Sequence, residues 1–403
     1  MAIKISGSTI IDDGRQLVNV GVSTISGVQI TSGIVTAVSG LATYYGDGQY
    51  LSNLPGWEPD SQYNLYAGTT AGTDSDADTC CNIGIGYSAL HSNCAGDKNI
   101  ALGACAGTNI KAGGCNVFLG AYAGMAAGDL SSLVNNIGIG LYAGACLNNS
   151  YFNVIIGMHG GQKVSTGHRN ILIGKMAGCE GPMTGQNNTY LGEYAGRCTT
   201  SGSDNIGLGR FSQGTGVVTG SNNITLGCKA ANNLTSGIDN IALGQLALGS
   251  GTVTGNYNAV FGKEAACNLT TGSDNFIAGC RAACQATTAF NSIIIGKGAA
   301  CGAVLTGNQN ILLGTTVAKN LVGAYNVMFG LNAGCQLGNA SANTFLGSYA
   351  AMGNTGAMCY SVAIGNKVDL PITSGNTQLA IGCNNTYWIV TTNSKLSITR
   401  CNR

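Results

Sequence analysis

Nineteen copies of one short pattern, Asn-x-x-x-Gly-x-x-Ala-(Gly/Ala), run along this chain of 403 residues. The central glycines fall between residues 68 and 382 at a mean spacing of 17.4 residues, and all but two of the intervals are 17 or 18. Clear copies pair Asn99 with Gly103, Asn116 with Gly120, and Asn258 with Gly262. A fixed period of this length predicts stacked supersecondary units that share one core.

Each repeat unit predicts a strand, a turn, a second strand and a second turn. The segment from Asn99 to Gly103 alternates small and large apolar residues, which favours a short half-buried strand. An Ala-Ala or Ala-Gly step follows and places very small side chains where space is short. A polar segment such as 270–274 comes next, and its residues suit tight turns. Parallel stacking at about 4.8 Å per coil gives a rod of roughly 90 Å, with the Asn side chains hydrogen-bonded in a ladder. The predicted fold is all-β: a parallel β-solenoid (β-roll) of about nineteen coils of 17–18 residues.

Composition excludes several other classes. The chain has 64 Gly, and interior Gly weakens a helix by about 1 kcal/mol, while neither heptads nor a collagen triplet occurs. A net charge of +1 gives no footprint for nucleic acid. The chain has no apolar run of about 18 residues and no apolar leader at its start. We therefore expect no membrane insertion, and folding in a cytoplasm.

Residues of the kinds that form catalytic or metal-binding sites are few in this sequence and scattered along it. The three histidines lack zinc spacing, no phosphate-binding loop is present, and Asp74, Asp76 and Asp78 open like a calcium loop without its sixth-position Gly. A solvated turn is favoured for these aspartates, with a cation pooled by three chains as the alternative. The 17 cysteines are expected to be free, packed thiols, with disulfides and metal binding as the alternatives. The chain is thus predicted to be no enzyme and to need no cofactor.

The two ends depart from the repeat. Residues 1–56, with β-prone runs at 8–11, 27–30 and 33–38, are expected to form an N-terminal β-shaft, and residues 57–63 a connector. The repeat array is assigned to 64–383 and a C-terminal cap or tip to 384–403. Because a 17-residue coil has a thin core, and repeated Ala, Gly and Cys allow close approach between chains, we expect a homotrimer; a monomeric solenoid is the alternative.

The only two tryptophans, Trp57 and Trp388, flank the array. One interpretation is that they close the ends of the stack, since stacked repeats need capping. The other is a glycan- or protein-binding tip. That tip would consist of Tyr387, Trp388, Lys395 and Arg400.

The segments 42–51, 64–72 and 375–382, together with the repeats, resemble tail-fibre-like structural proteins of cyanophages over nearly the whole chain. The resemblance implies an elongated homotrimer in the virion tail, assembled in the host cytoplasm. It further implies that residues 1–56 bind other tail or baseplate proteins and that the distal part meets a glycan or protein of the host surface. It carries no catalytic residues.

Two other functions remain open. The repeat is similar in style to the heads of trimeric bacterial adhesins, but the chain shows no signal peptide, coiled-coil stalk or C-terminal membrane anchor. A polysaccharide-degrading tailspike enzyme would place clustered acidic or basic residues in a groove, whereas charges here make up only 9% of the residues.

Overall fold

The computed structural model describes residues 3–5, 8–11, 59–125, 133–392 and 395–399. The chain divides into two compact units, residues 1–52 and residues 53–403. In the first unit, β1 (Ile3–Ile5) pairs antiparallel with β2 (Ser8–Ile11), so the run expected at 8–11 is a strand. The other runs predicted for the N-terminal shaft, and Trp57, lie outside the described residues.

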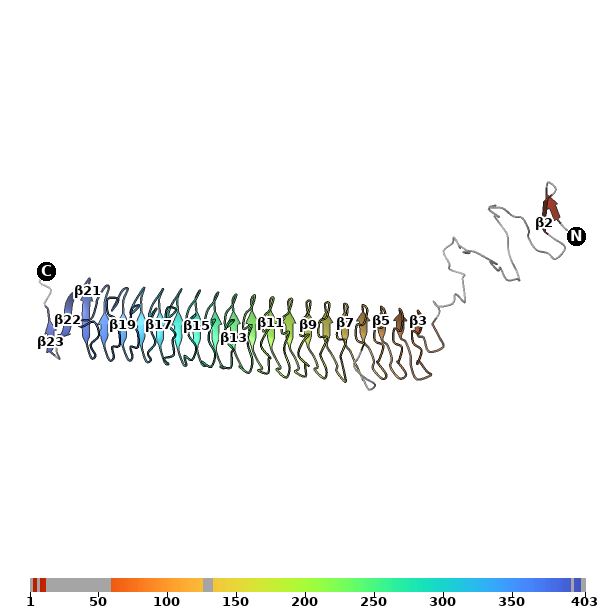
Figure 1. Cartoon of the computed structure of the whole chain (residues 1–403), viewed down its shortest axis with the longest axis horizontal. Helices are drawn as coiled ribbons and strands as arrows, with labels where there is room; N and C mark the ends of the chain where they lie inside the picture. Colours follow the sequence, from red (N-terminus) through yellow and green to blue (C-terminus); the bar gives the residue numbers. More distant parts are fainter. Residues whose placement is uncertain (1–2, 6–7, 12–58, 126–132, 393–394, 400–403) are drawn as a thin grey trace. The chain divides into compact units, whose positions relative to one another are not determined.

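The second unit consists of short strands that recur at the repeat period (Figure 1). Strands β3 to β20 have three residues each. They are β3 (Leu65–Ala67), β4 (Ile83–Ile85), β5 (Ile100–Leu102), β6 (Val117–Leu119), β7 (Ile137–Ile139), β8 (Val154–Ile156), β9 (Ile171–Ile173), β10 (Thr189–Leu191), β11 (Ile206–Leu208), β12 (Ile224–Leu226), β13 (Ile241–Leu243), β14 (Ala259–Phe261), β15 (Phe276–Ala278), β16 (Ile293–Ile295), β17 (Ile311–Leu313), β18 (Val327–Phe329), β19 (Thr344–Leu346) and β20 (Val362–Ile364).

Neighbouring strands pair in parallel and in register from β3 to β21 (Leu379–Cys383). Ile224, for example, lies opposite Ile206 on one side and Ile241 on the other. Among the described strands no register joins β23 back to β3, so the sheet is an open ladder along the chain. No helix occurs in the described ranges, and the predicted all-β parallel β-solenoid is confirmed, with about eighteen turns.

Each coil holds one regular strand, and the prediction of two was wrong. The part of the coil where the second strand was expected forms only isolated parallel bridges in some coils, such as Val164 with Met183 and Leu234 with Val253. The reason lies just after the central glycine, where the second and fourth residues have a left-handed backbone; in one coil these are Tyr122 and Gly124, both with φ of 57°. Such residues interrupt an extended strand.

The central glycine ends each strand. From Gly68 to Gly365 its φ lies between 124° and 146°, a region that side chains rarely adopt. The coils also approach closely here, because a Cβ on Gly103 would lie 2.7 Å from the carbonyl carbon of Gly120. A Cβ on Gly262 would lie 2.7 Å from the carbonyl oxygen of Gly279. Backbone conformation and stacking distance therefore both require glycine.

Three inward columns fill the coils: the middle residue of each strand, a small residue three positions after the central glycine, and an aliphatic residue from the polar turn segment. Phe118, Ala123 and Leu133 represent these columns and have no exposed surface. After each of the rings of Tyr66, Phe118 and Tyr190 the next coil has glycine in this column, and a Cβ on Gly138 would lie 2.8 Å from the Phe118 ring. Each core side chain is thus buried largely by the coil above and the coil below.

A spine of buried side chains runs beside the core. It is formed by the residue before each strand, which is Asn in most coils, Ser at 292 and 361, and Gln at 378. The Oδ1 atom of Asn223 accepts hydrogen bonds from the backbone N–H and the Nδ2 of Asn240, at 3.0 and 3.1 Å. Its own Nδ2 donates to Asn205 Oδ1 and to the carbonyl of Gly237. The same pattern links Asn116 to Asn99 and Asn275 to Asn258, which confirms the predicted ladder.

The ladder changes direction at its last coil. Gly382 lies within β21, and the chain returns through β22 (Thr386–Thr392) and β23 (Lys395–Ile398), both antiparallel to their neighbours. The turn is held to the coil below, because the backbone N–H groups of Asn384 and Asn385 donate to the carbonyls of Asn366 and Lys367, both at 2.8 Å. This three-stranded cap ends the parallel stack.

Candidate functional site

The largest candidate surface is the outward side of the parallel ladder. In each strand the middle residue is inward and the first and third are outward, and we call these outward residues of β3 to β20 the sheet face. Most are Ile, Leu, Val or Phe, and Ile224 and Leu226 are 40% and 46% exposed. A row two side chains wide along all coils covers on the order of 900 Å², which exceeds the apolar patches that monomeric soluble proteins usually expose.

The sheet face is not the surface that the sequence indicated for contact between chains. Ala106, Ala123 and Ala143, which represent the repeated alanines, have no exposed surface and pack inside the coil. These alanines therefore cannot bring chains together, and the expected role for them was wrong. The signal that points to the sheet face is the Ile-x-Leu or Ile-x-Ile spacing within each strand, whose branched residues flank the inward side chain.

The cap separates the residues that were predicted to form a binding tip. Tyr387 is half-buried against the core, and this burial, with a smaller effect of the Asp369 charge, raises its pKa. Trp388, the next residue of β22, is 47% exposed. Lys395 is exposed and lies opposite Thr392, whereas the carbonyl of Trp388 accepts a hydrogen bond from the N–H of Thr399. Four residues of strand, about 13 Å, therefore separate Trp388 from Lys395, and Arg400 lies outside the described residues.

A cavity of about 410 Å³ adjoins the cap. It is lined by Tyr349, Met352, Lys367, Asp369 and Asn385. The Nζ of Lys367 lies 5.9 Å from the centre of the Tyr349 ring, and Asp369 Oδ1 accepts a hydrogen bond from the N–H of Gly353 at 2.7 Å. An aromatic ring beside an amine, a carboxylate and an amide offers apolar contact and hydrogen bonds to a polar ligand such as a sugar.

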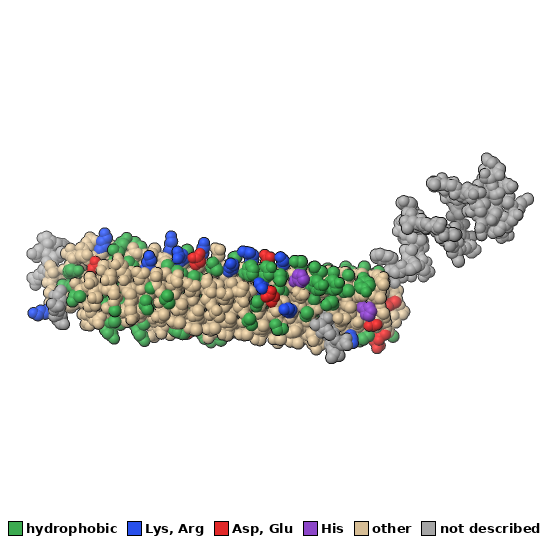
Figure 2. Space-filling model, viewed as in Figure 1, with side chains coloured by type: hydrophobic (Ala, Val, Ile, Leu, Met, Phe, Trp, Pro, Cys, Tyr) green, Lys and Arg blue, Asp and Glu red, His purple; other side chains and the backbone are tan. Residues whose placement is uncertain are grey.

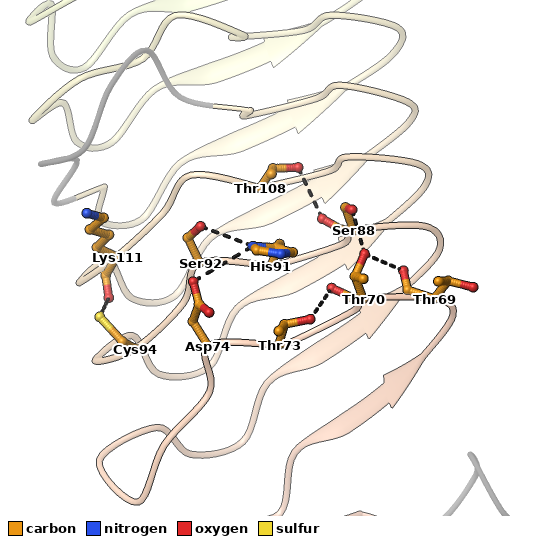
Figure 3. Close-up of polar contacts among 10 residues, drawn as sticks. All are labelled: Thr69, Thr70, Thr73, Asp74, Ser88, His91, Ser92, Cys94, Thr108 and Lys111. Atoms are coloured by element: carbon orange, nitrogen blue, oxygen red, sulfur yellow. Dashed lines mark hydrogen bonds and ion pairs between the residues drawn. The ribbon is translucent and has the colours of Figure 1, made fainter.

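Figure 3 shows polar contacts of the first coils, including those of Asp74 at the start of the acidic turn. The Nδ1 of His91 lies 3.8 Å from Asp74 and 3.3 Å from Ser92, and Thr70 and Ser88 share a hydroxyl hydrogen bond of 2.7 Å between two coils. Asp76 accepts from the N–H of Asp78 at 2.9 Å. In the part of the chain that the structure describes, no three His, Cys, Asp or Glu residues lie close enough to hold a metal.

The other two histidines stack on tyrosines in the coils. His159 extends a stack from Tyr122 and Tyr142, with ring centroids 4.7 and 5.2 Å apart. His168 stacks on Tyr151 at 3.7 Å, and its burial lowers its pKa and so favours the neutral ring. All three histidines thus lie in turn segments, and parallel stacking places the rings of His159 and His168 on tyrosine rings of neighbouring coils.

The cysteines of the described residues are all free. Some stack in one column, since the thiol of Cys267 points to the carbonyl of Cys284 at 3.3 Å and that of Cys284 to Cys301 at 3.5 Å. Burial, followed by the neighbouring thiol of Cys301, raises the pKa of Cys284 to about 12. A thiol held in this state is a weak nucleophile and metal ligand.

Comparison with known proteins gives no relative. No protein-family model matches the chain, and neither a curated protein nor a solved structure is significantly similar to it. None of the residues described in the structure forms a helix with the length and apolar character needed to cross a bilayer.

Proposed function

We propose that this chain is a structural component of a tailed-phage virion, a tail fibre or baseplate appendage. It forms a rigid homotrimeric rod in the virion tail, holds other tail or baseplate proteins through residues 1–56, and meets a glycan or protein of the host surface. The solenoid is compatible with this role, and the resemblance of the repeats to cyanophage fibre proteins favours it.

The sheet face is the observation that carries the proposal. Its apolar side chains extend along every parallel coil, and a partner made of the same chain offers a face of matching length and spacing. Exposed apolar residues also flank it at the position before the spine, where Phe152, Tyr257 and Tyr325 are 52–61% exposed. Three chains that turn their sheet faces to a common axis bury these flanks between neighbours as well.

Sedimentation and light scattering of the purified protein test the assembly. We expect a mass three times the 40.6 kDa of the chain and, in electron micrographs, a slender rod at least roughly 90 Å long. Ile224→Glu with Leu226→Glu introduces two charges into the sheet face and should yield single chains. The matched control is Val217→Glu with Val304→Glu, since these apolar residues are 56% and 48% exposed outside the strands.

Two results would contradict the proposal. One is a single-chain mass for the unaltered protein. The other is a trimer that survives the sheet-face charges as well as it survives the control charges.

We propose that the cap, at the end of this rod, contacts the host surface. Trp388 offers an exposed ring, and the cavity of Tyr349, Lys367 and Asp369 is also lined by Asn385, in the turn that leads into β22. Trp388→Ala should weaken adsorption of the rod to host cells while its mass stays that of the trimer. Unchanged adsorption would remove the cap from the contact.

A further inference from the structure

Positively charged residues are concentrated in the segment that follows the central glycine of each coil. The residue two positions after each glycine donates its N–H to the carbonyl of the residue one position after the glycine in the previous coil. Such bonds join Arg281 to Lys263 at 2.8 Å and Thr316 to Lys297 at 2.9 Å. These positions therefore lie one above another at the coil spacing of about 4.8 Å. We call the first, second and fifth positions after the glycines the cationic edge.

Half of the chain's 18 Lys and Arg residues lie on this edge, although the sequence suggested scattered charges. Figure 2 shows Lys and Arg side chains gathered along one side of the coils. The residues are Lys175, Arg197, Arg210, Lys229, Lys263, Arg281, Lys297, Lys319 and Lys367.

Carboxylates neutralise only part of the cationic edge. Glu193 lies 3.6 Å from Lys175, Glu180 lies 2.7 Å from Arg197, and Glu264 lies between Lys263 and Arg281 at 3.8 and 3.6 Å. Within the described ranges, Lys229, Lys297 and Lys319 have no carboxylate within 4.0 Å. The excess positive charge is therefore greatest between Lys263 and Lys319.

A hollow opens at this point of greatest excess. Its volume is about 320 Å³, and Arg281, Lys297, Lys319, Thr315 and Cys301 contribute to its lining. Gly298 makes the space, because it stands where neighbouring coils carry Arg281 and Thr316. A Cβ on Gly298 would meet only the Thr316 Cγ2 atom, at 3.5 Å. Three cations thus surround a gap that has room for an anionic group.

The arrangement fits a linear chain of anions. The cations form one row that follows the axis of the coils, with a repeat set by the strand spacing. Single-stranded nucleic acid also needs surfaces for its bases, and the edge from Lys263 to Lys319 carries no aromatic side chain on which a base could stack. A polysaccharide with a sulfate or carboxylate on successive sugars satisfies both the charge and the single-row geometry.

We propose that the cationic edge between Lys263 and Lys319 binds a linear acidic polysaccharide, with one anionic group held between Arg281, Lys297 and Lys319. This binding site rests on the proposed function in host attachment. It adds the class of ligand and places a contact on the side of the coils. Each exposed charge pair is weak, so binding comes from many pairs and is multiplied by the copies in an assembly.

Binding of the full-length protein to immobilised dextran sulfate, alginate and neutral dextran tests the site. We expect binding to at least one of the two acidic polymers, none to neutral dextran, and a strong decrease when salt is raised, because exposed charges are screened. Lys297→Gln with Lys319→Gln should weaken binding at least tenfold. Lys111→Gln with Lys163→Gln removes the same charge from turn residues outside both the cationic edge and the flanks of the sheet face, and should leave binding unchanged.

A second pair of variants fills the hollow without removing a cation. Gly298 has a φ of 63°, which Asn and Asp tolerate. Gly298→Asp should reduce binding well below that of Gly298→Asn, since the two differ only in charge. Four results would overturn the site. Two concern the variants: an equal loss of binding in the edge pair and the control pair, or equal binding by the Gly298→Asp and Gly298→Asn variants. The other two are absence of binding to both acidic polymers and tighter binding to duplex DNA. The mass of each variant is measured in the same samples, so failure of the site is distinguished from failure of the trimeric rod.

Discussion

Each coil contributes residues to two columns, the spine of amides and the cationic edge. The residue type is nearly constant along the spine and varies from coil to coil along the edge. A spine residue bonds to identical residues above and below, as Asn223 does with Asn205 and Asn240, so a change in one coil disturbs three. The edge contains residues as different as Tyr142, Glu264 and Gly298 at one position. Its backbone bonds hold the register, and its charged side chains face solvent. The coils therefore keep their shape through the inner columns and have the outer ones free for binding.

The largest effect is expected where the coils are closest. Gly244 has a φ of 138°, and its Cβ would lie 2.6 Å from the carbonyl group of Gly262. Gly244→Ala combines strain with a clash and should lower the free energy of unfolding by about 3 kcal/mol or more. The control is Gly338→Ala, because a Cβ there meets nothing within 4 Å, and it should shift stability by less than about 1 kcal/mol. Similar urea midpoints for the two variants would contradict the close stacking.

The spine is tested next. Asn223→Ala leaves the N–H of Asn240 and the carbonyl of Gly237 without their partner, and should cost about 2–3 kcal/mol. Asn223→Ser should cost less, because a serine hydroxyl can accept the next N–H, as Ser292 accepts that of Asn310 at 3.2 Å. Urea unfolding measures the loss, and hydrogen exchange of the Asn240 amide measures the local opening. An alanine variant as stable as the serine variant would mean that the amide ladder contributes little.

Much of this inner architecture was predictable from the sequence, because the spine residue and the central glycine are nearly invariant. The Asn and Gly periods predicted the parallel stack, the spine and the coil length. The edge was not predictable in the same way: Arg210, Lys229 and Lys263 stand at unequal intervals, and only the register places them in one row. The second strand was wrongly expected because residues such as Tyr122 have no sequence mark of a left-handed backbone.

Cysteine reactivity compares two positions of the cationic edge within one coil, the first and the fifth after Gly279. Cys280 is exposed on the edge, whereas Cys284 is buried and has a pKa of about 12. Because the thiolate is the reactive form, iodoacetamide at pH 8 should alkylate Cys284 at least about tenfold more slowly than Cys280. Peptide mass spectrometry over time measures both rates. Equal rates in the folded protein, with denatured protein as the reference, would place Cys284 outside the interior.

The smallest effect concerns an ion pair on the edge. The hydrogen bond from Arg197 lowers the pKa of Glu180 from its ordinary 4.5. The pair therefore stabilises the fold above that value, and its contribution is lost as pH falls through the lower folded pKa. Since the two side chains are 29% and 38% exposed, Glu180→Gln should cost less than about 1 kcal/mol at pH 7. The difference between the variant and the unaltered protein should shrink at pH 3, and a difference that is as large at pH 3 as at pH 7 would contradict the pairing.

Diffraction from oriented samples of the purified rods tests the stacking of coils most directly. Parallel, in-register coils predict a strong reflection at about 4.8 Å along the rod axis, from the spacing that places one spine amide above the next. A pattern with no axial repeat near this value, or with that repeat perpendicular to the rods, would contradict the stacked solenoid and the binding surfaces that depend on it.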